Sequence, residues 1–131
     1  MLQLVYISSA SPAGQIDVAP ILQASRRNNV RDGLSGLLYA DGRRFLQVLE
    51  GEPDAVETAF ARISADSRHR AVVVLSRRDI AAREFGDWAM AHRAPGDDAD
   101  AFIARVDALS ATASPDVQAT FASFARLRRA A

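Results

Sequence analysis

The chain has 131 residues, of which 49% are hydrophobic and 24% are charged, a composition typical of one soluble globular domain. Its 16 basic residues, all of them arginine, balance 16 acidic residues, so no net positive charge supports nucleic-acid binding. The absence of cysteine excludes disulfides, thiolate metal sites and a cysteine nucleophile.

A short, nearly continuous apolar run over residues 2–8 predicts a first strand that is buried on both faces. Residues 9–14 then form a loop. Asp17 is a suitable N-cap for a helix, with Pro20 in its first turn. The helical spacing of apolar residues continues to about Asn29. The N-terminal segment has no basic region or long apolar run, and no window matches a membrane span, so we expect a cytoplasmic protein.

Two further strands follow this helix, over residues 34–40 and 44–51. The Asp41-Gly42 pair between them is a strong hairpin signal. On the third strand, alternation places Gln47 between apolar side chains on a face that should be buried. A buried amide without a partner costs about 1–3 kcal/mol, so Gln47 needs a hydrogen-bonding partner.

Pro53 at a first helical position predicts a second helix, and residues 71–76 and 84–92 predict a fourth and a fifth strand. The apolar stripe of this second helix consists of Val56, Ala59, Phe60 and Ile63. One face of the fifth strand carries Trp88, Met90 and His92.

The order β-α-β-β-α-β with an added fifth strand predicts an α+β, ferredoxin-like fold with two helices on one face of the sheet. Residues 1–93 would form this core. Residues 94–131 predict a helical extension that covers the other face or mediates oligomerisation. Its two helices carry apolar residues at helical spacing, namely Phe102, Ile103, Val106 and Leu109 in the first and Val117, Phe121 and Phe124 in the second.

Several of these residues also occur together, in order, in one protein family. They are Tyr6 in LVYISSA, Asn29 in NNVRDGLSGLL, Gln47 in FLQVLEG, Asp66, Arg68 and His69 in ISADSRHR, and Phe85, Trp88 and Met90 in REFGDWAM. Over residues 1–93 the chain resembles the BLUF domains, the flavin-binding blue-light sensors of bacteria. It is similar to their stand-alone short forms.

The resemblance implies that an FAD isoalloxazine ring lies between the two core helices. Asn29 would bind the carbonyl and N3 edge of the ring, and Gln47 would lie between the N5/O4 edge and the hydroxyl of Tyr6. Trp88 and Met90 would be on the strand that changes alignment after illumination and relays the signal. The other positions that match the family's pocket are Ile21, Asn28, Arg62, Ile63 and Asp66.

The function implied by this resemblance is that of a blue-light photoreceptor without enzymatic activity. Light would excite FAD, and Tyr6 would transfer an electron and a proton. Gln47 would be left in an altered hydrogen-bonding state, with a small red shift of flavin absorption that recovers in darkness. Output would pass through the C-terminal helices to an unknown protein partner, from a homo-oligomer that binds neither nucleic acid nor membrane.

Taken singly, the same residues have simpler structural interpretations. Gln47 could be satisfied by backbone groups, and Arg62 and Asp66 at i, i+4 could form a surface ion pair. His69 and His92 are too separated in the sequence to indicate a metal site.

Two other functions stay open at this point. One is a ferredoxin-like small-molecule-binding or oligomerisation module without photochemistry. The other is an acylphosphatase-like hydrolase, but the loop SSASPAG lacks the arginine that its phosphate cradle needs. The motifs GxGxxG, GxxxxGK[ST], HExxH and GxSxG are all absent.

Overall fold

The computed structural model describes residues 1–10, 18–41, 43–66, 69–93 and 96–130, without the side chains of Ala10, Val18, Ala19, Ile21 and residues 127–130. The predicted N-cap Asp17, most of the predicted loop before it and Arg68 lie outside the described residues, as does the side chain of Ile21. The elements are β1 (Leu2–Ala10), α1 (Val18–Arg31), β2 (Ser35–Ala40), β3 (Arg44–Gly51), α2 (Pro53–Ala65), β4 (His69–Asp79), β5 (Trp88–His92), α3 (Ala99–Leu109) and α4 (Pro115–Ala130).

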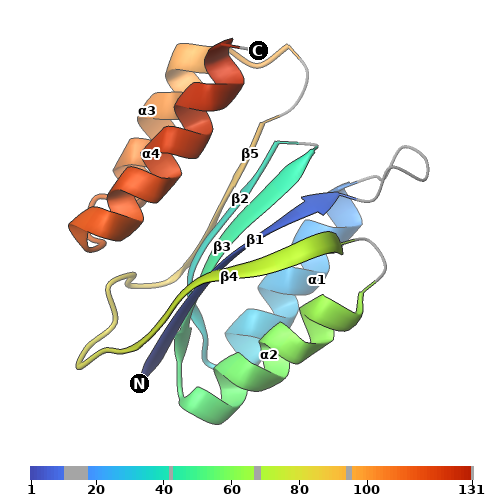
Figure 1. Ribbon diagram of the computed structural model, residues 1–131, viewed down its shortest axis with the longest axis vertical. Coiled ribbons are helices and arrows are strands. Elements are labelled where there is room, and N and C mark those ends of the chain that lie inside the picture. The colour runs from blue at the N-terminus through green and yellow to red at the C-terminus, as the bar shows by residue number, and fades with distance from the viewer. Residues whose placement is uncertain (11–17, 42, 67–68, 94–95, 131) are drawn as a thin grey trace.

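The strands form one mixed sheet in the order β4-β1-β3-β2-β5. β1 is antiparallel to both β3 and β4, β2 is antiparallel to β3, and β5 is parallel to β2. Helices α1 and α2 cover one face, here called the inner face, and α3 and α4 lie on the opposite, outer face (Figure 1). This arrangement confirms the predicted α+β, ferredoxin-like fold with an added strand and a helical pair on the second face.

The element boundaries differ from the prediction in three places. Helix α1 runs to Arg31, and Gly33, with φ of 71°, ends the turn that follows it. β4 is longer than the predicted residues 71–76 because its pairing with β1 runs almost the whole length of that strand. β5 begins only at Trp88, because the backbone N–H of Phe85 donates to the Glu50 side chain instead of to a neighbouring strand.

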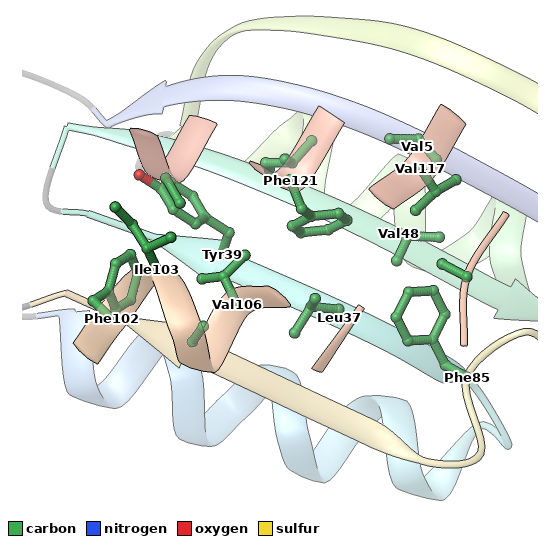
Figure 2. Packing of buried hydrophobic residues seen from close by; sticks show 14 residues of the cluster. Val5, Leu37, Tyr39, Val48, Phe85, Phe102, Ile103, Val106, Val117 and Phe121 are labelled. Carbon is green, nitrogen blue, oxygen red and sulfur yellow. The ribbon is translucent and has the colours of Figure 1, made fainter. Parts of the chain in front are cut away.

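The outer face carries a continuous hydrophobic core between the sheet and the C-terminal helices. Val5, Tyr39 and Val48 point from the strands toward Val106 of α3 and Phe121 of α4 (Figure 2). All five side chains are at most 3% exposed. The helical pair therefore buries the apolar side chains that the first four strands and two helices leave uncovered.

Candidate functional site

Tyr6 and Gln47 lie directly opposite each other on the neighbouring strands β1 and β3. The hydroxyl of Tyr6 donates a hydrogen bond to Oε1 of Gln47, and both residues are about 1% exposed. Directly opposed residues on antiparallel strands point to the same face of the sheet. The partner that Gln47 needs is therefore a phenol, supplied by a strand 41 residues away in the sequence.

This pair belongs to a cross-strand row that spans the whole sheet. In register, the row consists of Val74, Tyr6, Gln47, Leu38 and Met90. Its side chains point to the inner face, where Tyr6, Leu38 and Met90 belong to one hydrophobic cluster. Met90 of β5 is thus in the same row as the hydrogen-bonded pair, because it pairs with Leu38, which pairs with Gln47.

Trp88 lies two residues before Met90 and shares the inner face. It pairs with Gly36 of β2, whose φ is 143°. A Cβ on Gly36 would collide with the backbone carbonyl of Val48 and would meet the indole ring of Trp88 at 3.4 Å, an ordinary contact distance. Glycine is therefore needed here because of its φ and the close approach of the Val48 carbonyl.

Helices α1 and α2 cover different strands of this row. α2 packs on β1, β3 and β4, and α1 lies beside β5. From α2, the ring of Phe60 lies 5.5 Å from that of Tyr6, between centroids. Ile63, one turn further along, packs against the same cluster. From α1, Asn29 is 2% exposed and Asn28 is half-buried.

Polar groups on this face have hydrogen-bonding capacity that the described residues do not use. Among them, Gln47 makes one side-chain hydrogen bond, through its oxygen, and Asn29 makes none through its side chain. The indole Nε1 of Trp88 is buried without a partner in the described part of the chain. An unpaired buried donor costs about 1–3 kcal/mol. A carboxamide offers both donors and an acceptor, so Gln47 and Asn29 have the chemistry to bind the polar edge of a ligand.

Burial also sets the protonation of the phenol. Loss of solvation disfavours the phenolate and raises the pKa of Tyr6 far above its ordinary value of 10.0. The hydroxyl therefore keeps its proton at neutral pH, as the hydrogen bond that it donates to Gln47 requires.

Arg62 and Asp66 do not form the ion pair that their spacing on α2 suggests. Nη2 of Arg62 lies 3.8 Å from Oδ2 of Asp32, in the turn after α1, while Asp66 caps the C-terminus of α2. Arg62 and Asp32 thereby connect the ends of the two inner-face helices. A hydrogen bond from Arg31 lowers the pKa of Asp32, with further electrostatic contributions from Arg31 and Arg62.

One contact near the site was not foreseen from the sequence. Oγ of Ser8 lies 2.8 Å from Nδ1 of His69, whose ring is 4.5 Å from that of Phe45. Ser8 is on the face of Tyr6 because it is two residues further along β1. Alternation along β1 could therefore have identified Ser8. Its contact with His69 could not be predicted, because it depends on where β4 begins and how it pairs with β1.

Two classes of site are not found in the described part of the chain. No group of three or more histidine, aspartate or glutamate side chains there could hold a metal ion. No described helix is both long and apolar enough to cross a membrane.

Comparison with known proteins assigns the chain to a family. The family model described as sensors of blue light using FAD matches residues 1–91. The dark-state structure of BlrB, a BLUF protein, is 36% identical with a TM-score of 0.63, over 70% of this chain and 70% of that one. The BLUF structure of BlrP1, a protein of Klebsiella pneumoniae, has a TM-score of 0.72 at 29% identity, over 87% and 78%.

Among curated proteins, photoactivated adenylate cyclase subunit beta of Euglena gracilis is 32% identical over 91 residues. The match covers 67% of this chain but only 11% of that protein's length. The resemblance noted in the sequence is thus confirmed over the region that carries Tyr6, Asn29, Gln47 and Trp88. The chain belongs to the BLUF family of blue-light sensors.

Proposed function

We propose that the chain is a blue-light photoreceptor that binds FAD non-covalently between α1 and α2. The observation that carries this proposal is the buried hydrogen bond from Tyr6 to Oε1 of Gln47, which lies among apolar side chains and leaves the NH2 group of Gln47 available to a ligand. A purely structural Tyr–Gln pair would not explain why the indole Nε1 of Trp88 is also buried without a partner in the described part of the same face.

The residues that would hold the flavin line the inner face of the sheet. Asn29 and Gln47 supply carboxamides for the polar edge of the ring, and Ile63 supplies apolar contact from α2. Asn28, Arg62 and Asp66 would contribute at the ends of the two helices. Ile21 completes the proposed set by the resemblance to the family.

When bound, FAD supplies the absorption of blue light and an excited state that takes an electron from a nearby phenol. Tyr6 would be that phenol, and its proton would move along the existing hydrogen bond to Oε1 of Gln47. Once the phenol is restored, the carboxamide of Gln47 would remain rotated or tautomerised, since an amide both donates and accepts.

The altered Gln47 would bias β5, which carries Met90 in the same cross-strand row and Trp88 beside it. The C-terminal helices pack on the opposite face of that sheet. We propose that they carry the output to a separate protein partner, in a homo-oligomeric receptor, and that the chain itself performs no catalysis.

The experiment that tests this function is an absorption spectrum of FAD-loaded protein before and after blue illumination. We expect a reversible red shift in the wild-type protein. Tyr6→Phe should still bind FAD, because it keeps the ring, but should lose the shift, because it removes the donated proton. Tyr39→Phe is the matched control, since Tyr39 is equally buried but on the outer face, with its hydroxyl donating to Asp41.

A Tyr6→Phe protein with a normal photocycle would contradict the mechanism. A wild-type protein that stays colourless after FAD is supplied would contradict flavin binding and favour a ferredoxin-like binding or oligomerisation module.

A further inference from the structure

A row of polar side chains crosses the outer face at the end of the sheet, next to the hydrophobic core. Arg78 of β4, Gln3 of β1, Glu50 of β3 and Ser35 of β2 follow one another in register. Nε of Arg78 donates to Oε1 of Gln3 at 2.9 Å, and Nε2 of Gln3 donates to Oε2 of Glu50 at 3.0 Å. The row thus links the four strands by their side chains as well as by their backbones.

Glu50 is the centre of this row and is fully buried. Its Oε1 accepts from Oγ of Ser35 and from the backbone N–H of Phe85, both at 3.0 Å. Its Oε2 accepts from Gln3 and from the backbone N–H of Glu84, the latter at 2.9 Å. A carboxylate offers about four lone-pair positions, and here every one has a donor. Two of those donors belong to the β4–β5 connection.

The hydrogen bonds continue from the β4–β5 connection to the turn between α3 and α4. The carboxylate of Glu84 accepts from Arg78 and from the backbone N–H of Ser114, the latter at 2.5 Å. Oγ1 of Thr112 donates to the backbone oxygen of Glu84 at 2.6 Å. Figure 1 shows the β4–β5 connection and the α3–α4 turn near each other at the left side of the view.

The position of Glu50 in the chain makes this contact functionally relevant. It lies three residues after Gln47 on β3, and Phe85 lies three residues before Trp88. The side chain of Glu50 therefore connects β3, which carries Gln47, to the segment that leads into β5. Glu84 connects the same segment to the turn between α3 and α4.

We propose that Glu50 is a positioning residue that couples β3 to the β4–β5 connection and, through Glu84, to the α3–α4 turn. A change at Gln47 then reaches the output helices through this polar row as well as through Met90. The proposal rests on the photoreceptor function proposed above and adds a second route of transmission to it.

The test is amide hydrogen exchange of the FAD-loaded full chain, in darkness and under blue light, with Glu50→Gln. Glutamine keeps the shape but replaces one acceptor oxygen with a donor, so a backbone N–H of Glu84 or Phe85 loses its partner. We expect exchange of at least one of those two amides to become about tenfold faster in darkness. We also expect the light-induced change in exchange at residues 111–114 to disappear, while the red shift itself stays at the wild-type value.

Glu57→Gln is the matched control, because it makes the same change of carboxylate to carboxamide in a glutamate that contacts β4 only at the exposed surface, through Arg77. It should behave like the wild type in both measurements. Glu84→Gln is the second variant, since it weakens only the last step. Exchange at Phe85 should stay slow in Glu84→Gln, while the light-induced change at the turn should fall.

A purely structural role for Glu50 predicts a different result, namely faster exchange in darkness with the light-induced change at the turn retained. That outcome in Glu50→Gln, or wild-type behaviour of Glu84→Gln, would overturn the coupling. A wild-type protein with a red shift but no light-induced change at the turn would refute the coupling alone. A wild-type protein without a red shift would refute the photochemistry and the coupling with it.

Discussion

The two faces of the sheet differ in how completely their buried polar groups are hydrogen-bonded. On the outer face, Glu50 has a donor for each of its acceptor positions, and the buried side chains of Gln3 and Ser35 beside it are hydrogen-bonded as well. On the inner face, the described contacts leave Gln47, Asn29 and Trp88 with unused hydrogen-bonding groups. A protein tolerates the second condition where a ligand completes the hydrogen bonds. The comparison teaches that the polar groups of the outer face are satisfied by the chain alone, whereas the inner face is where we propose that FAD completes the hydrogen bonds.

The largest expected difference between the faces is in stability. Phe121→Ala empties a fully buried position between α4 and the sheet, so we expect the free energy of unfolding to fall by about 3–5 kcal/mol. Phe60→Ala removes a half-buried ring beside Tyr6 and should cost about 1–3 kcal/mol. Urea unfolding of both variants without FAD measures the difference. Equal losses would mean that the inner face is packed as completely as the outer face.

A second difference concerns the backbone beneath Trp88. Gly36→Ala places a side chain on a residue with φ of 143° and against the carbonyl of Val48. We therefore expect the free energy of unfolding to fall by about 1–3 kcal/mol because of strain, and the Trp88 fluorescence spectrum to change. Gly86→Ala is the control, because a Cβ there meets nothing within 4 Å, and its effect should be within about 0.5 kcal/mol of zero. Wild-type fluorescence in Gly36→Ala would show that the indole does not depend on this close approach.

The buried phenol predicts a loss of stability in alkali. The pKa of Tyr6 is raised by burial, so above pH 10.0 the unfolded chain releases a proton that the folded chain retains. The stability from this residue is therefore fully present below pH 10.0 and falls as the pH rises, by at most about 1.4 kcal/mol per pH unit. Tyr6→Phe should flatten this dependence in urea titrations above that pH. An unchanged slope would mean that the phenol titrates normally.

The smallest expected effect is that of Asn29→Ala, which should change FAD affinity but not the stability of the FAD-free protein. Asn29→Ala removes a carboxamide that makes no side-chain hydrogen bond to the other described residues, so unfolding of the FAD-free protein should change little. FAD binding should weaken by up to about tenfold, since one hydrogen bond contributes about 0.5–1.5 kcal/mol. Gln23→Ala, on the exposed side of α1, should change neither quantity in a flavin fluorescence titration. Equal FAD affinity in Asn29→Ala would remove Asn29 from the proposed site.

Much of the fold could be predicted because its signals are local. Alternation along β3 placed Gln47 on one face and Val48 on the other, and helical spacing in α3 and α4 identified Val106 and Phe121 as core. The order of elements then restricted the topology to a ferredoxin-like sheet. The structure places β4 at an edge of the sheet, where Val73 is 49% and Leu75 is 45% exposed. This edge position was not predicted. An apolar run is compatible with either an edge or a central strand, and only the order of strands decides between them.

What the sequence by itself determined is which elements form, which side chains of an element share a face, and the ordered residues by which the family is identified. Only the tertiary structure decided which residues meet: Tyr6 with Gln47, Arg62 with Asp32 instead of Asp66, and Glu50 with the amides of the β4–β5 connection. The physical reason is that periodicity is set by neighbours along the chain, whereas a cross-strand partner depends on register. A shift of one residue in register would move every side chain of a strand to the other face.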